Sequence, residues 1–227
     1  MHSCVRTLHT FFSLGLLFAS AAQAAPVHES PTSKVVDVLA QAAPAADRKV
    51  IELAMHALSC VRPADGLGER TLSVIDYSRP STEPRLWVFD LAAKTLLFEE
   101  RVAHGRNTGG NRAEHFSNAP GSLMSSIGAF ETAGTYTGHN GYSLRLRGLE
   151  PGFNDHAYER AIVIHGAPYV SDGLVQSMGR LGRSFGCPAV RPSIAHQLID
   201  AIRSESFVFA YYPDREWLAN SRYLSDC

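Results

Sequence analysis

The sequence lacks the features that mark a membrane-spanning, nucleic-acid-binding or low-complexity protein. Its 21 Lys and Arg residues balance 22 Asp and Glu residues, so it has no basic excess of the kind that nucleic acid selects. It shows no internal repeat and no low-complexity tract. Its N-terminal apolar run, residues 11–22, is about a dozen residues long and too short to span a bilayer comfortably. The 227 residues suit one globular domain with a short appendage.

The N-terminus reads as an export signal. A weakly basic start precedes the apolar run, and Ala22-Gln23-Ala24 supplies the small residues that a signal peptidase requires. Cys4 lies before the run, so it is not a lipid-attachment cysteine. We therefore expect residues 1–24 to be a cleaved signal peptide and the mature protein to be periplasmic or secreted. An uncleaved membrane anchor is the alternative.

Cysteine is scarce, and its count after cleavage is odd. The mature chain keeps Cys60, Cys187 and Cys227 in what we expect to be an oxidising compartment, where two can pair and one stays free. Cys60 ends a predicted helix and Cys227 is the last residue, so both lie at the edges of the domain. We predict a Cys60–Cys227 disulfide that leaves Cys187 as the free thiol.

The periodicity of apolar residues divides the chain into a helical segment and a mainly β domain. Helical spacing predicts helices over 34–42 and 48–60, capped by Ser33 and Asp47. From residue 71 the pattern becomes strand-like, and the expected strands cover 71–77, 85–91, 95–103, 126–132, 142–149, 161–165 and 206–212. Helical spacing returns over 172–179 and 192–203. The expected organisation is a signal peptide at 1–24, a linker and helical appendage at 25–68, a main β domain at 69–215 and a tail at 216–227.

Residues 103–121 have no periodicity and are dense in Gly, Asn, Arg and His. Such a loop on a β scaffold can line a site. A plain surface loop is an equally good interpretation.

Cys187 stands in the motif Ser-Phe-Gly-Cys-Pro, whose neighbours suit a reactive cysteine. Gly186 allows close backbone approach and unusual dihedral angles. Pro188 has no N–H to offer, so a carbonyl oxygen beside the sulfur could be held by the amides of Gly186 and Cys187. Two such amides form the kind of oxyanion hole that acyl transfer needs.

The same region of the sequence contains a candidate base for the Cys187 thiol. A free thiol is mostly protonated at neutral pH and needs a neighbouring base or cation. His165 ends an apolar strand, and the carbonyl of Gly166 could orient its ring. Arg183 and Arg191 flank the cysteine and could bind a substrate carboxylate through two hydrogen bonds. Each residue alone is more often structural, but together with export and an odd cysteine they favour a reactive site.

The motif resembles a known catalytic signature. His165-Gly166, followed about twenty residues later by Ser184-Phe-Gly-Cys187, is similar to the signature of L,D-transpeptidases of the YkuD type. The similarity extends over roughly residues 70–213, and this wider run also resembles a proteobacterial branch of murein L,D-transpeptidases. The segments that carry it are Val74–Ser78, Arg85–Val88, Val102–Gly105, Tyr142–Leu146, Ile162–Gly166 and Gly182–Pro188.

The resemblance implies a fold and a reaction. The fold would be mainly β, an L,D-transpeptidase-like β-sandwich of mixed sheets with one or two packed helices and the N-terminal helical appendage. The reaction would be acyl transfer on peptidoglycan stem peptides, without a cofactor or metal: Cys187 attacks a donor tetrapeptide, releases D-alanine and passes the acyl group to an amine. His165 would be the base, Gly166 the carbonyl that orients it and Ser184 the Ser/Thr of the motif. Tyr169 is a further candidate for substrate contact.

The chain departs from the family pattern at two positions. Phe185 stands where His often precedes Gly-Cys, and Ala189 where Arg or Asn often follows the cysteine. The alternatives are a carboxypeptidase or amidase that resolves the same acyl-enzyme with water, and a wall-binding module without turnover. Zinc chemistry would use His165 and Asp172, whose spacing occurs in zinc peptidases. That site needs further ligands, and no Glu-x-x-His follows downstream.

Overall fold

The computed structural model describes residue 1 and residues 31–62, 71–203, 205–225 and 227. Apart from its first residue, the predicted signal peptide lies outside these residues. The helices are α1 (Pro31–Ala42), α2 (Arg48–Val61), α3 (Asp172–Met178), α4 (Pro192–Ile202) and α5 (Arg215–Asn220). The strands are β1 (Thr71–Asp76), β2 (Leu86–Asp90), β3 (Thr95–Glu100), β4 (Gly128–Gly138), β5 (Gly141–Gly148), β6 (Val163–Gly166), β7 (Ala189–Val190) and β8 (Phe207–Tyr211). Within the described ranges, no helix combines the length and the apolarity that crossing a bilayer would need.

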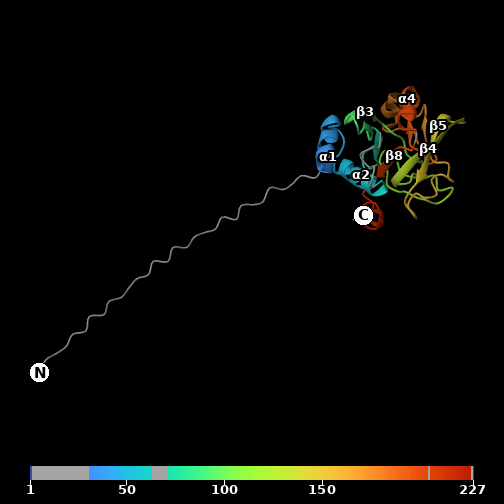
Figure 1. Cartoon of the computed structure of the whole chain (residues 1–227). Helices are drawn as coiled ribbons and strands as arrows, with labels where there is room; N and C mark the ends of the chain where they lie inside the picture. The colour runs from blue at the N-terminus through green and yellow to red at the C-terminus, as the bar shows by residue number, and fades with distance from the viewer. Residues whose placement is uncertain (2–30, 63–70, 204, 226) are drawn as a thin grey trace.

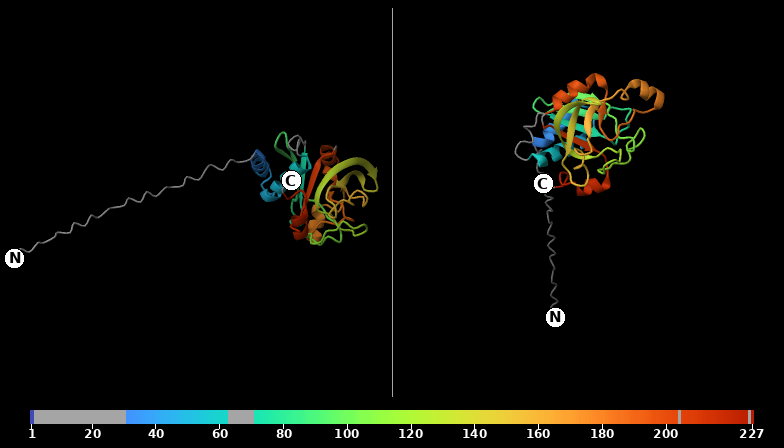
Figure 2. Two further views of the ribbon diagram at one scale, coloured as in Figure 1. Left: turned by 60° about the horizontal axis from the view of Figure 1, so that its bottom comes forward. Right: turned by 90° about the vertical axis from the view of Figure 1, so that its right-hand side faces the viewer.

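The strands form one mixed sheet of eight strands in the order β3-β2-β1-β8-β4-β5-β6-β7. The β1–β8 and β6–β7 pairs are parallel and the others antiparallel, which confirms the mainly β fold with mixed pairing. β4 bends along its length (Figure 2), and its register with β5 shifts between Thr132 and Thr135. Ala103, just beyond β3, bridges to Ala189 of β7. The two edges of the sheet therefore nearly meet.

The N-terminal appendage is a pair of helices that packs on the sheet, on the side away from β4 and β5 (Figure 1). The Asp47 side chain caps α2 by accepting a 2.8 Å hydrogen bond from the Lys49 amide, as the sequence predicts. The expected cap at Ser33 is wrong, because α1 begins at Pro31 and Ser33 lies inside its first turn. The buried face of α2 consists of Val50, Ile51, Ala54, Met55, Ala57 and Leu58. This face joins the main core, so the appendage is part of the folded unit.

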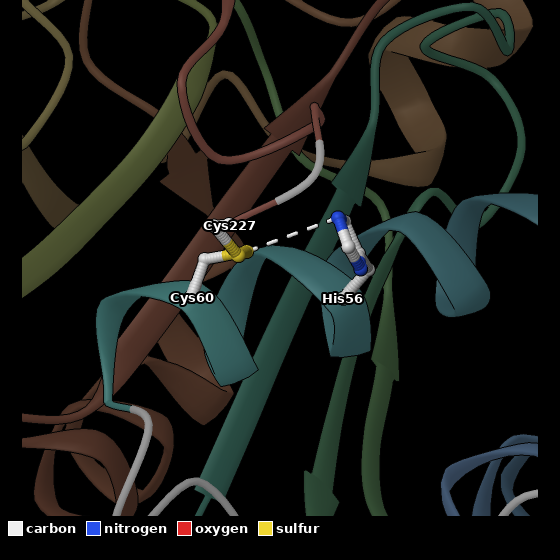
Figure 3. A group of neighbouring side chains, drawn as sticks. All are labelled: His56, Cys60 and Cys227. Carbon is white, nitrogen blue, oxygen red and sulfur yellow. Dashed lines mark hydrogen bonds between the residues drawn. A yellow bond between two sulfur atoms is a disulfide. The ribbon is translucent and has the colours of Figure 1, made fainter.

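A disulfide closes the chain. It joins Cys60 near the end of α2 to Cys227 across a sequence separation of 167, which is the pairing expected from the cysteine count. Figure 3 shows His56, one turn earlier on α2, beside the bridge, with its Nε2 atom 3.8 Å from the Cys60 sulfur. The same nitrogen lies 3.2 Å from the carbonyl oxygen of Ser225. The C-terminus is thus held against α2 by both the disulfide and a hydrogen bond.

The segment expected as a tail is partly structured. It contains α5, whose Trp217 is fully buried. The indole Nε1–H of Trp217 donates a 3.0 Å hydrogen bond to the buried carboxylate of Glu150. The helix is short and carries a single buried side chain, which is too little periodicity to identify from the sequence.

Candidate active site

The backbone at Gly186 brings the free cysteine, Cys187, against β6. Gly186 has a φ of 130°, a conformation that side chains rarely adopt. A Cβ atom there would also lie 2.8 Å from the Met124 carbonyl oxygen, so only glycine fits. Cys187 then places its sulfur beside the start of the strand. The Val163 amide donates to Sγ at 3.5 Å, and the thiol donates to the Ala161 carbonyl at 3.6 Å.

Ser184 organises the turn that carries Cys187. Its hydroxyl donates to the Cys187 carbonyl at 2.6 Å and accepts from the Gly186 amide at 3.0 Å. Its own amide donates to the carbonyl of His104 at 2.9 Å. The Gly186 amide is therefore engaged within the turn and does not face the sulfur as the sequence predicts for an oxyanion hole. Of the two expected donors, the amide of Cys187 remains next to its own Sγ.

The loop of residues 103–121 supports this turn. A Cβ atom on Gly105 would lie 3.0 Å from the Cα of Gly186, so the two backbones are in close contact. Ser125, just after the loop, donates from its hydroxyl to the Gly186 carbonyl at 2.9 Å and accepts from the Gly105 amide at 3.0 Å. The loop thus supports the turn that carries Cys187 and is not a plain surface loop.

His165 lies on β6 with one ring nitrogen already bound. Its Nδ1 atom is 3.0 Å from the Gly166 carbonyl oxygen, the partner expected from the sequence. Because a carbonyl only accepts, Nδ1 carries the proton and Nε2 is left as the basic nitrogen. A Cβ atom on Gly166 would lie 2.9 Å from the Cβ of Ala195 in α4. Glycine therefore allows α4 to pack closely behind the histidine.

Cys187 and His165 open into one cavity of about 380 Å³. Two of the sequence-predicted substrate contacts, Tyr169 and Arg183, line it. The Arg183 side chain donates from Nη1 to the carbonyls of Arg106 and Gly109 at 3.0 and 2.9 Å. The full lining consists of His139, Asn140, Arg160, Ala161, His165, Tyr169, Arg183, Ser184, Phe185 and Cys187.

Sequence reasoning did not identify four of these lining residues as parts of the site: His139, Asn140, Arg160 and Ala161. His139 and Asn140 form the turn between β4 and β5, and Arg160 precedes β6. Arg160 is five positions before His165 in the chain, and this proximity to the motif is the one signal that points to it.

Burial controls protonation in the cavity. It lowers the pKa of His165, partly offset by the hydrogen bond to Gly166, so the ring is neutral at neutral pH. It raises the pKa of Cys187, against the Val163 amide and the charge of Arg160, which both lower that pKa. Burial also raises the pKa of Tyr169 to about 12. The resting site therefore pairs a thiol with a neutral imidazole beside a neutral phenol.

Arg191 lies elsewhere, contrary to its expected role beside the cysteine. Its guanidinium forms two hydrogen bonds of 2.9 and 2.6 Å with the carboxylate of Glu100, the residue that ends β3. This pair lines a separate cavity of about 220 Å³. Arg191, the second candidate for binding a substrate carboxylate, is thus already paired with the carboxylate of Glu100.

The two departures from the family pattern have different surroundings. Phe185 is 69 % exposed at the cavity, with the guanidinium of Arg106 5.9 Å from its ring centre. Ala189 is fully buried and pairs with His165 across β6 and β7. Ala189 packs in a small buried apolar cluster, so a larger side chain there would displace buried neighbours.

Within the described ranges, His165 belongs to no group of converging metal-ligating side chains. Asp172, the partner considered for zinc, pairs with Arg101. Among the described residues, the group whose ligand atoms meet is His56, Cys60 and Cys227, and its two cysteines form the disulfide.

Comparison with known proteins identifies the family. The family model described as the L,D-transpeptidase catalytic domain matches residues 42–211. Similar solved structures include an L,D-transpeptidase from Mycobacterium smegmatis, at 13 % identity and a TM-score of 0.41, where the match covers 63 % of this chain and 59 % of the other. L,D-transpeptidase 1 of Mycobacterium tuberculosis matches at 12 % identity and a TM-score of 0.36, over 63 % and 62 %. The C442S mutant of the Enterococcus faecium L,D-transpeptidase matches at 13 % identity and a TM-score of 0.37, and the match covers 63 % of this chain and 50 % of the other.

The match thus spans between half and two thirds of the length of these solved chains. A comparison with curated proteins finds no match. The family model covers most of the sequence and includes both Cys187 and His165. The chain therefore belongs to the family of L,D-transpeptidase catalytic domains.

Proposed function

We propose that this protein is an exported enzyme that transfers acyl groups between peptidoglycan stem peptides through a thioester on Cys187. The observation that carries the proposal is the shared cavity of Cys187 and His165. In that cavity the Gly166 carbonyl binds Nδ1 of His165 and leaves Nε2 free to take a proton. This is the arrangement that an activated nucleophile requires.

The reaction proceeds in two half-steps. Nε2 of His165 takes the thiol proton as Sγ of Cys187 attacks the carbonyl of the diaminopimelate residue in a donor tetrapeptide. The amide bond to D-alanine breaks, the imidazolium returns its proton to the leaving amine, and a thioester remains. An acceptor amine then loses a proton to His165 and attacks the thioester, which restores the thiol. The amide of Cys187 is the donor that we assign to the oxyanion.

Side chains around the cavity suit a substrate with carboxylates. Arg183 is exposed and binds its internal carbonyls through one terminal nitrogen, so the rest of its guanidinium fork can bind a carboxylate. The phenol of Tyr169 stays protonated and can donate a hydrogen bond. We assign both to the stem peptide.

Two features support export. The predicted signal peptide at residues 1–24 is one. The other is the Cys60–Cys227 disulfide, because disulfides persist in oxidising compartments such as the periplasm. In such a compartment Cys187, the free thiol of the described chain, is the one left for chemistry.

The test is mass spectrometry of purified tetrapeptide muropeptides after incubation with the wild type, Cys187→Ala and His165→Ala. We expect cross-linked dimers with loss of D-alanine from the wild type and none from Cys187→Ala. His165→Ala should be slower by about 10²–10⁴-fold, since it lacks the base. His156→Ala is the matched control, because His156 is an exposed histidine paired with Glu159 outside the cavity.

Three outcomes would contradict the proposal. Shortened monomers alone would indicate a hydrolase that resolves the same thioester with water. Full activity in Cys187→Ala would exclude the cysteine mechanism. No change with folded wild-type protein would favour a wall-binding module.

A further inference from the structure

The guanidinium of Arg160 is held rigidly at the base of the cavity. Nη1 donates to the carbonyl of Ser117 and the hydroxyl of Ser126, both at 2.6 Å. Nη2 donates to the hydroxyl of Ser122 at 3.1 Å and the carbonyl of Met124 at 2.6 Å. Four bonds to terminal nitrogens leave the group no freedom to swing toward a substrate, so its position is a property of the fold.

This fixed group lies against the backbone that holds the nucleophile. Its acceptor, the Met124 carbonyl, touches Gly186, where a Cβ atom would come within 2.8 Å. On the other side, the thiol of Cys187 donates to the carbonyl of Ala161, the residue that follows Arg160. Arg160 and Cys187 also line the same cavity. The sulfur is thus flanked by two segments that both connect directly to Arg160.

The positive charge of Arg160 is not matched by a carboxylate within these contacts. All four acceptors are neutral carbonyls or hydroxyls. Burial lowers the pKa of Arg160, whereas interaction with Cys187 raises it. The reciprocal effect holds at the sulfur, where Arg160 lowers the pKa of Cys187. Arg160 and Cys187 therefore stabilise each other in their charged forms.

Other titratable groups that face the sulfur do not replace this charge. Tyr77, which directly follows β1, and Tyr169 both have a pKa raised to about 12 by burial and stay neutral. His165 is neutral until it takes the thiol proton. His139 and Arg183 are exposed residues of the cavity lining, so water screens the guanidinium charge of Arg183.

We propose that Arg160 is a fixed cation that stabilises the Cys187 thiolate formed when His165 takes the proton. The inference rests on the proposed role of Cys187 as nucleophile. It assigns thiolate stabilisation to a residue outside the His-Gly and Ser-x-Gly-Cys motifs. It also separates two arginines of one cavity by role: Arg160 is locked onto the protein beside the sulfur, and Arg183 remains available to the substrate.

The experiment measures thiol reactivity and needs no substrate. The alkylation rate of Cys187 by iodoacetamide is followed against pH by mass spectrometry of the peptide that contains Cys187. The variants are Arg160→Gln, which removes the charge, and Arg160→Lys, which keeps it and loses most of the hydrogen bonds. Arg183→Gln removes the other cavity arginine. Circular dichroism verifies the fold of each.

We expect the midpoint of the alkylation profile to move to higher pH in Arg160→Gln, with a rate at pH 7 lower by about three- to tenfold. The range allows for the greater intrinsic nucleophilicity of a more basic thiolate. The alkylation midpoint of Arg160→Lys should lie close to the wild-type value, and that of Arg183→Gln should equal it. An unchanged midpoint in Arg160→Gln would overturn the proposal. Equal midpoint shifts in Arg160→Gln and Arg160→Lys would also overturn it, because they would indicate that lost anchoring of the loop causes the shift. A midpoint shift in Arg183→Gln as large as that in Arg160→Gln would overturn it as well.

A second pair of variants serves if Arg160→Gln does not fold. Ser126→Asp places a carboxylate on the guanidinium and cancels its charge while the anchor stays. Ser126→Asn is the neutral match. We expect the alkylation midpoint to rise in the Asp variant alone, and equal midpoints would refute the role of Arg160. Because alkylation needs only the thiol, these results stay readable whether or not muropeptides are cross-linked.

Discussion

His104 is a buried histidine whose protonation should govern stability in acid. Its ring is 1 % exposed, with Nδ1 2.8 Å from Nη2 of Arg85 and Nε2 3.1 Å from the Gly110 carbonyl oxygen. A guanidinium only donates and a carbonyl only accepts, so Nδ1 must be bare and Nε2 protonated. Burial and the charge of Arg85 together lower the pKa of His104 to about 3.

The sign and size of the effect follow by linkage. In the unfolded chain His104 has its ordinary pKa of 6.5, so below that value the unfolded state binds a proton that the folded state refuses. Stability is therefore lost as pH falls from 6.5 toward 3. pH 5 lies 1.5 units below the ordinary pKa of His104. At about 1.4 kcal/mol per pH unit, the free energy of unfolding falls by about 2 kcal/mol.

The assay is urea unfolding of the wild type and His104→Gln at pH 7, 6 and 5. Glutamine keeps a donor and an acceptor but cannot titrate. We expect the variant to be less stable than the wild type at pH 7 and to lose less stability as the pH falls. We expect the difference in unfolding free energy between the two proteins to narrow by about 2 kcal/mol between pH 7 and pH 5. Other groups, such as His165, titrate in both proteins and cancel. A difference that stays constant with pH would refute the reasoning.

Two further predictions concern the turn and the disulfide. Ser184→Ala leaves the Gly186 amide and the Cys187 carbonyl without their buried partner, which should cost about 2–4 kcal/mol and lower activity. Ser184→Thr keeps the hydroxyl and should be near wild type in urea unfolding, so equal losses in both variants would contradict this. Cys227→Ser removes the bond to Cys60 and should destabilise by up to about 5 kcal/mol. Reductant should then lower the stability of the wild type and leave that of the variant unchanged. If reductant does not change the stability of the wild type, the disulfide does not stabilise the fold.

The parts of the site that sequence reasoning predicted depend on neighbours in the chain. The carbonyl that orients His165 belongs to the next residue, Gly166. The glycine that the turn needs immediately precedes Cys187. Such contacts are fixed by local backbone geometry, so the residue types and their order are sufficient to infer them.

The parts that it missed, or placed wrongly, depend on partners far along the chain. Arg191 is four residues from the cysteine, yet its partner is Glu100, which β7 reaches because the sheet nearly closes on itself. The Gly186 amide was expected at the oxyanion, but the Ser184 hydroxyl turns inward and binds it. Arg160 gains its position from hydrogen bonds to residues 117–126. None of these pairings has a signature in spacing or composition.

By itself the sequence determined the mainly β class, the helical appendage and the nucleophile and base candidates, because periodicity and glycine placement act locally. The cysteine count required one thiol to stay unpaired within the chain, and the structure decided that Cys60 and Cys227 form the pair. Only the tertiary structure decided which arginine faces the cavity and which amide is already bound. It also decided which loop supports the turn that carries Cys187. Those choices depend on the curvature of one eight-stranded sheet, which brings separate segments together through contacts that no short stretch of sequence encodes.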